Sequence, residues 1–309
     1  MQVISIGGKI GVNCYVLITG FYLSKSEGTN VKSLIKLFME TTIFSIVIYW
    51  CLVFRGEEII DKGSIIVYSI PIMYDVWWFA STYFVLVIIS PILNSFINNS
   101  GEKILRKILI SMTVMFYVIP TISFLIQIDS YFQANNLVLF IYLYVLGGYL
   151  NKYREEIVVK INWMLVLSFL VIIHIAAYMY CNLVGISWEQ TTKLTNEMQS
   201  LPMLFISIAL FCVFMSLPAT YYRWINIIAK STFGVYLIHD HPLMRYRIWE
   251  GMLKMSSHVG SKYLVPYSIF SITIVFVICW TVSFLYDMTL GKVIETVLGK
   301  SQSMLSRLQ

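Results

Sequence analysis

The sequence predicts an all-α protein, a polytopic membrane bundle of about nine transmembrane helices, on the strength of three observations. Hydrophobic residues make up 58% of the chain and charged residues 12%, whereas a soluble domain carries roughly twice that charged share. Apolar runs recur along all 309 residues, and no polar block between them is long enough to fold by itself. The short gaps between the runs hold most of the basic residues, as the loops of membrane proteins do.

Nine apolar runs are the predicted spans. They cover residues 10–23, 35–54, 76–97, 108–128, 137–150, 161–183, 201–217, 225–239 and 264–286. Several are shorter than the ~20 residues that a lone transmembrane helix needs. The run 137–150 therefore requires protein neighbours, a tilt or a locally thinner bilayer. Pro91, Pro120 and Pro202 lie in or beside these runs, where neighbouring helices can satisfy the carbonyls that proline frees.

The distribution of basic residues predicts the orientation. Positively charged loops stay on the cytoplasmic side, and one set of alternate gaps holds fourteen of the 22 lysines and arginines. This set comprises Lys25, Lys32, Lys36, Lys103, Arg106, Lys107, Lys152, Arg154, Lys160, Arg223, Lys230, Lys292, Lys300 and Arg307. We therefore expect a cytoplasmic C-terminus and an external N-terminus.

The two ends of the chain carry expectations of their own. An external N-terminus directly before a span, with no signal peptide, indicates either a reverse-anchored first helix or a preceding helix that this reading frame lacks. At the other end, residues 292–309 are predicted to form a short cytoplasmic amphipathic tail on the membrane surface. Residues 1–291 then form a single membrane domain.

Composition excludes several classes of site. The five cysteines are scattered through apolar runs, where a free thiol behaves as a small hydrophobe, so neither a disulfide framework nor a metal site is expected. The net charge of +6 is accounted for by membrane topology, and we expect no nucleic-acid partner.

Four motifs occur in a fixed order along the chain. They are GVNCYVLITGFYL at residues 11–23, WWFASTYFVL with SPILN at 77–94, YLYVLGGYL at 142–150 and STFGVYLIH at 231–239. Each alone is a common apolar pattern. Together they resemble the membrane acyltransferase type 3 family, and within it the bacterial capsule, O-antigen and exopolysaccharide O-acetyltransferases.

The resemblance implies a bundle of about ten helices in the bacterial plasma membrane that transfers an acyl group. The donor would be acetyl-CoA or another acyl-CoA, and the acceptor a hydroxyl of a surface polysaccharide or lipid-linked sugar, with membrane lipid around it and no bound cofactor. Two departures stand out. The family's first helix, with its arginine and histidine, has no counterpart before Met1, and the arginine pair after the second helix is represented by Lys32 and Lys36. We expect a truncated reading frame or a degenerate homologue.

His239 is the candidate catalytic base, because it ends an apolar helix and is followed by Asp240 and His241, which could orient it or share its proton. The alternative is a helix-end histidine that reaches the membrane interface. His174 lies in the middle of a span and is expected to hydrogen-bond a neighbouring helix. His258 is expected in a solvated connection.

The candidate substrate-binding residues fall into two groups. Lys32 and Lys36 lie one turn apart at a predicted cytoplasmic helix end and could seat phosphates, although ordinary positive-inside charge explains them as well. The remaining candidates are polar or aromatic side chains, which either contact a sugar or tie helices together and anchor the interface. They are Asn13, Trp78, Tyr83, Tyr236 and Arg245, with Trp77, Tyr74, Asp75, Thr82 and Arg247 beside them.

A non-enzymatic function stays open at this point. A glycan transporter, a flippase component or an inactive partner would show internal repeats and broken helices with ionisable groups at the midplane. The sequence has no detectable repeat, and His174 is the ionisable group that we place there.

The topology yields a direct prediction. A reporter fused after Gln309 should be cytoplasmic and one inserted near Lys193 external, because lysine and arginine concentrate in the alternate gaps. Accessibility labelling of each fusion in intact cells measures this. The opposite side at either position would remove the orientation argument.

Overall fold

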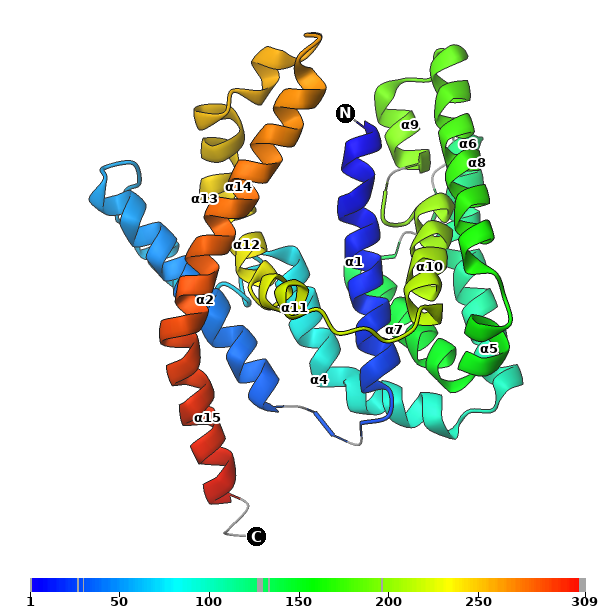
Figure 1. Cartoon of the computed structure of the whole chain (residues 1–309), viewed down its shortest axis with the longest axis horizontal. Helices are drawn as coiled ribbons and strands as arrows, with labels where there is room; N and C mark the ends of the chain where they lie inside the picture. Colours follow the sequence, from blue (N-terminus) through cyan, green and yellow to red (C-terminus); the bar gives the residue numbers. More distant parts are fainter. Residues whose placement is uncertain are drawn as a thin grey trace. The chain divides into compact units, whose positions relative to one another are not determined.

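The structure is a computed structural model that describes residues 2–26, 28–29, 31–126, 130–132, 134–195 and 197–305. Every regular element in these segments is helical, which confirms the predicted all-α class. The chain divides into two compact units (Figure 1). Unit 1 comprises Met1–Thr29 and Val85–Ala219, and unit 2 comprises Asn30–Phe84 and Thr220–Gln309.

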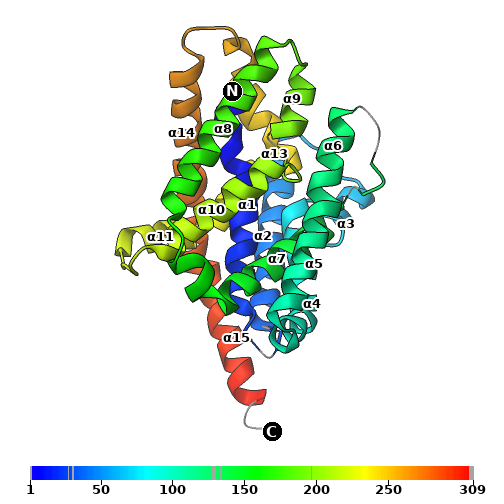
Figure 2. The ribbon, with the colours of Figure 1, turned by 90° about the vertical axis from the view of Figure 1, so that its right-hand side faces the viewer.

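Unit 1 is built around one buried helix. Its elements are α1 (Gln2–Leu23), the second part of α4 (Trp78–Asn99), α5 (Glu102–Thr113), α6 (Ile119–Leu125), α7 (Asn136–Lys152), α8 (Trp163–Leu183), α9 (Trp188–Thr195) and α10 (Leu201–Ser216). Eleven residues of α7 are buried, as expected for a helix that is apolar on all sides. The short run 137–150 thus obtains the protein neighbours that its length requires. Figure 2 shows α1 passing beside α7 and α10, with both of which it is in contact.

Glycines bring α1 and α7 into close contact. A Cβ atom on Gly20 would overlap the carbonyl oxygen of Tyr144, and one on Gly147 would overlap the carbonyl oxygen of Leu17. Helices in membranes associate through such small residues because lipid supplies no hydrophobic force between them. The Tyr144 hydroxyl then donates to Asn94 Oδ1 at 2.7 Å, which ties α7 to α4.

Unit 2 surrounds a short central helix. Its elements are α2 (Val31–Phe54), α3 (Lys62–Ser69), the first part of α4, α11 (Arg223–Lys230), α12 (Thr232–His239), α13 (Pro242–Tyr246), α14 (Leu264–Tyr286) and α15 (Lys292–Leu305). Helix α12 contacts both α2 and α14. The buried side chains of Phe44, Trp77, Leu237 and Tyr286 form its core.

Five helices in the described segments are long and apolar enough to cross a membrane. They are Val31–Phe54, Trp78–Asn99, Glu102–Phe124, Trp163–Leu183 and Leu264–Gly299, and Leu201–Ser216 is a shorter apolar helix. These helices show a multi-pass membrane protein, but a total of nine spans stays a prediction. The predicted span 108–128 ends in residues 127–128, which lie outside the described part of the chain.

The predicted span 225–239 is wrong as a single helix. Ser231 ends α11 and begins α12, and its hydroxyl donates to Asp287 Oδ2 at 2.6 Å. Helix α12 has eight residues and is therefore about 12 Å long, well short of the ~30 Å apolar core of a bilayer. Hydropathy alone merges the two helices because the polar stretch between them, Lys230 to Thr232, is short and has apolar residues on both sides.

The predicted tail continues the last span. A π-helical turn, Asp287–Gly291, joins α14 to α15, so the helical path runs from Leu264 to Leu305 (orange to red in Figure 1). Arg307 and the end of the tail lie outside the described residues. The position of this tail on the membrane surface stays a prediction.

The close contact between α1 and α7 predicts a steric penalty. Gly20→Ala should lower the free energy of unfolding by roughly 1–3 kcal/mol, the usual result of overpacking. Gly11→Ala on the same helix is the matched control, because nothing lies within 4 Å of its Cβ position. Thermal unfolding in detergent compares the two variants. Equal melting temperatures would show that α1 and α7 are not held this closely.

Candidate active site

The imidazole of His239 lies at the C-terminal end of α12. Its Nδ1 lies 2.7 Å from the carbonyl oxygen of Val235. A carbonyl can only accept, so Nδ1 carries the proton and Nε2 keeps its lone pair in the neutral ring. Nε2 makes no hydrogen bond with any residue that the structure describes. The local fold therefore prepares His239 to accept a proton at Nε2.

Asp240 does not orient His239 in this structure. Its carboxylate accepts from Arg245 at 2.9 Å, and the Val235 carbonyl holds the imidazole instead. Arg247, the other arginine of this segment, binds the side chains of Glu57 and Glu58 and the carbonyl of Leu243. Arg247 is thus committed to internal contacts, whereas the exposed side chain of Arg245 has a single carboxylate partner.

His241 is fully buried between the rings of Tyr68 and Trp77. Its Nδ1 accepts from the backbone N–H of Leu243 at 3.1 Å, which caps α13 and places the proton of the neutral ring on Nε2. His241 Nε2 and Trp77 Nε1 are buried N–H donors that find no acceptor among the described residues. Buried donors without partners are rare and suggest a role beyond packing.

Three of the predicted residues, Trp78, Tyr83 and Tyr236, surround the ring of Phe79. The Phe79 ring stacks on Tyr83 at 5.9 Å and meets Tyr236 edge-on at 5.8 Å. Trp78 contacts the same ring, and Tyr236 also meets His239. We call Trp78, Phe79, Tyr83 and Tyr236 the aromatic group. It places flat apolar rings beside the predicted base, although Trp77 is buried and is not an interface anchor.

Lys32 and Lys36, which are predicted to bind phosphate, lie in unit 2 at the start of α2. The Lys36 ammonium forms an ion pair with Glu295 of α15 at 2.6 Å. Lys32 and Lys230 also lie within electrostatic range of this carboxylate. Three ammonium groups from α2 and α11 thus lie in contact with or within electrostatic range of one carboxylate, and we call Lys32, Lys36 and Lys230 the lysine cluster. The sequence could not group Lys230 with Lys32 and Lys36, because Lys230 follows Lys36 by almost two hundred residues.

Glu40 is a buried carboxyl that sequence reasoning missed. It is the only acidic residue of α2 and only 9% exposed. An ionisable side chain inside an apolar helix is by default a candidate functional residue. That signal was present in the run 35–54, where Glu40 stands between Met39 and Thr41.

Other candidates have local roles. Asn13, in unit 1, is fully buried and donates to Ser207 at 3.3 Å, which links α1 to α10. Thr82 donates to the carbonyl of Trp78 in its own helix. His174 Nδ1 is buried, but it has no partner among the described residues, so the predicted interhelical bond from it is not formed. His258 is half-buried and stacks on Tyr267.

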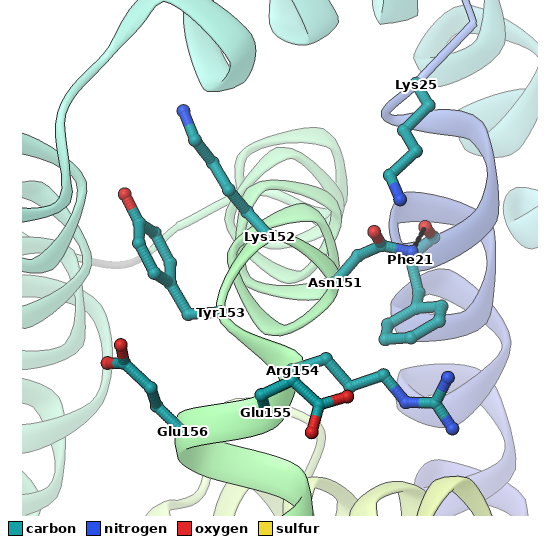
Figure 3. A pocket seen from close by; sticks show the side chains of 8 residues that line it. All are labelled: Phe21, Lys25, Asn151, Lys152, Tyr153, Arg154, Glu155 and Glu156. Atoms are coloured by element: carbon teal, nitrogen blue, oxygen red, sulfur yellow. Dashed lines mark hydrogen bonds between the residues drawn. The ribbon is translucent and has the colours of Figure 1, made fainter.

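Unit 1 contains a pocket of about 330 Å³, and two of its three basic side chains are engaged in hydrogen bonds within the protein. Figure 3 shows its lining residues: Phe21, Lys25, Asn151, Lys152, Tyr153, Arg154, Glu155 and Glu156. The Lys152 ammonium donates to the carbonyls of Ile97, Asn98 and Ser100 at the end of α4. Arg154 donates to Met215, beyond which α10 ends. These cations complement helix C-termini, and two glutamates share the pocket, so it is poorly suited to an anionic ligand.

Burial of His241 predicts a pH-dependent loss of stability. Burial lowers its pKa from 6.5 to about 3. Between these values the unfolded chain binds a proton that the folded chain does not, so stability falls as the pH drops below 6.5. At pH 5 the loss is about 2 kcal/mol. His241→Asn keeps an acceptor for the Leu243 N–H and should lose less between pH 7 and 5. Identical pH dependence of the two melting temperatures would contradict this assignment.

Comparison with known proteins adds the family. The family model described as an acyltransferase domain matches residues 1–285. Neither the curated proteins nor the solved structures contain a significant match to the chain. The matched residues cover all of α1 to α13 and nearly all of α14, including His239 and the aromatic group. The chain therefore belongs to the membrane acyltransferase type 3 family.

Proposed function

We propose that this chain is an O-acyltransferase of the bacterial plasma membrane. It transfers an acetyl group from acetyl-CoA to a hydroxyl of a cell-surface or lipid-linked glycan. One observation carries the proposal: in a chain of an acyltransferase family, the Val235 carbonyl leaves His239 Nε2 free to accept a proton beside the aromatic group. The other features of unit 2 supply what acyl transfer requires.

The reaction needs a base and donors for a developing oxyanion. The acceptor oxygen attacks the thioester carbonyl carbon as its proton passes to His239 Nε2. The carbon–sulfur bond then breaks, and its electron pair leaves on sulfur as the CoA thiolate. The unpartnered N–H groups of His241 and Trp77 are of the kind that stabilises negative charge on oxygen.

The lysine cluster is the proposed seat for the phosphates of the donor. Ammonium groups bind phosphate as point charges. Lys36 contacts the Glu295 carboxylate, and Lys32 and Lys230 lie within electrostatic range of it. A carboxylate already bound at this position supports the idea that the cluster accepts anions. Donor phosphates would displace or join Glu295 there.

The aromatic group is the proposed platform for the acceptor. Trp78 and Tyr83 offer flat rings on which the apolar face of a sugar packs, and Arg245 offers exposed N–H donors for an anionic group of the glycan. Asn13 lies in unit 1 on Ser207, so we assign it to helix packing rather than to the substrate.

A glycan transporter is the second candidate, and one observation favours it. Transporters use broken helices with ionisable groups near them, and unit 2 has the break between α11 and α12 together with buried Glu40. The two functions differ in product. A transporter moves the glycan unchanged, whereas the enzyme forms an acetyl ester.

His239→Ala should abolish glycan acetylation in membrane vesicles supplied with radiolabelled acetyl-CoA. Loss of a general base typically lowers the rate ~100-fold to 10,000-fold. His258→Ala is the matched control, because that histidine lies in the connection before α14 and stacks on Tyr267 rather than on the aromatic group. It should keep a rate within about threefold of wild type, far from the loss of a base. Protein abundance in the membrane normalises both rates.

Acetylation by His239→Ala at the wild-type rate would remove His239 from the reaction. Wild-type vesicles that form no acetyl ester but carry glycan across the membrane would instead establish the transporter.

A further inference from the structure

The pocket of unit 1 is lined by charges of both signs that the protein itself does not use. Lys25, which follows α1, forms no ion pair or hydrogen bond with the described residues, and neither do Glu155 and Glu156 in the π-helical turn after α7. The neighbouring cations do not neutralise these glutamates, because Lys152 and Arg154 donate to backbone carbonyls instead. Figure 3 shows Lys25 coming from the α1 side of the pocket and both glutamates from the turn after α7.

This lining matches a ligand that carries both charges itself. An anion would be repelled by the two carboxylates, and a cation would be repelled by Lys25. A ligand with a phosphate and an ammonium group can place the phosphate at Lys25 and the ammonium group at a carboxylate, and hydrogen bonds between charged groups are the strong ones. The volume of about 330 Å³ is at the lower end of the usual range for small-ligand pockets, so it suits a small polar group.

The pocket lies at the depth where two candidate membrane spans have their ends. Lys152, one of its lining residues, donates to the carbonyls of Ile97 and Ser100 at 2.9 and 2.8 Å, at the end of α4. Trp163, the first residue of α8, donates from Nε1 to the carbonyl of Ile157 in the π-helical turn at 3.0 Å. Tryptophan at the end of a span is typical of the headgroup region of a bilayer. The pocket therefore lies at headgroup depth, on the side predicted to be cytoplasmic.

Exposed apolar side chains border the pocket. Arg154 of its lining donates to the carbonyl of Met215, and the Tyr22 hydroxyl contacts the sulfur of the same methionine at 4.0 Å. Tyr22 is 64% exposed, and Phe214, next to Met215, is 66% exposed. The acyl chains of a lipid whose headgroup occupies the pocket can lie on this apolar surface.

From this arrangement we propose that the unit 1 pocket binds the headgroup of a phospholipid that carries both a phosphate and a primary ammonium group, as phosphatidylethanolamine does. Lys25 contacts the phosphate, and Glu155 and Glu156 accept hydrogen bonds from the ammonium group. A glycerol headgroup has no cation and a choline headgroup has no N–H to donate, so both bind more weakly. The inference concerns unit 1 alone and holds whether or not the chain transfers acyl groups.

Photo-labelling by a lipid tests the site. The whole chain is reconstituted in phosphatidylcholine vesicles that contain a trace of phosphatidylethanolamine with a photoreactive acyl chain. The peptides that contain Tyr22 and Phe214 should be labelled. Unlabelled phosphatidylethanolamine should suppress this labelling at least about threefold more effectively than phosphatidylglycerol, which is the scale of one exposed charge pair. Equal suppression by the two lipids, or no labelling of these peptides, would overturn the proposal.

Substitutions separate the two charges of the ligand. Glu155→Gln combined with Glu156→Gln should remove the advantage of phosphatidylethanolamine over phosphatidylglycerol, because the amides carry no charge. Lys25→Gln should lower labelling of both peptides about two- to fivefold. Lys103→Gln is the matched control, because Lys103 is an exposed lysine at the start of α5 that does not line the pocket. An unchanged advantage in the double variant, or equal labelling of Lys25→Gln and Lys103→Gln, would contradict the assignment.

Free phosphoethanolamine distinguishes a lipid from a soluble ligand. It carries the same two charges without acyl chains, so it should suppress the labelling far less than phosphatidylethanolamine does. Suppression as strong as that by the lipid would show that the pocket takes a soluble zwitterion, and it would overturn the assignment to a phospholipid.

Discussion

The hydrogen bond from Ser231 to Asp287 determines the arrangement of unit 2. In an apolar surrounding, polar groups must find partners within the protein, and this bond at 2.6 Å joins the start of α12 to the turn that ends α14. Because it interrupts the helix at Ser231, α12 spans only about 12 Å and its last residue lies in the interior of the unit. His239 is half-buried there as a result, and the following segment folds back so that His241 packs against Trp77. A continuous helix from residue 225 to residue 239 would have placed His239 at a different position relative to the aromatic group.

Buried polar groups differ between the contact of α1, α4 and α7 in unit 1 and the surroundings of α12 in unit 2. At the contact of α1, α4 and α7 in unit 1, the amide of Asn94 donates to Leu23 and Ser26 and accepts from Tyr144, so all its groups are used. Satisfied networks of this kind fix helices in place. Around α12 the donors of His241 and Trp77 and the hydroxyl of Ser283 find no partner among the described residues. Several buried polar groups without hydrogen-bond partners in one place lower the stability of the fold. They are the usual sign of a site that binds a ligand or passes protons.

Much of the fold and part of the site could be predicted from the sequence. Hydropathy located α2, α4, α8 and α14, and the short apolar run 137–150 indicated a helix surrounded by protein, which α7 is. The family motifs located His239 and the aromatic residues at positions 78, 83 and 236. Hydropathy could not reveal the break at Ser231, because it depends on a partner 56 residues away. For the same reason Lys230 and Glu295 could not be joined to Lys36, and the choice of Arg245 over His239 as the partner of Asp240 required the geometry of the turn.

The central claim is that acyl transfer takes place along α12, with the donor held by the lysine cluster. Photo-crosslinking with an acyl-CoA analogue that carries the reactive group on its adenine measures the position of the donor most directly. We expect labelled peptides from the start of α2, from α11 and from α15, with labelling suppressed by unlabelled CoA and weakened in Lys36→Gln. Labelling confined to the unit 1 pocket at Lys25 and Lys152, equally suppressed by CoA, would place the donor elsewhere and contradict the account.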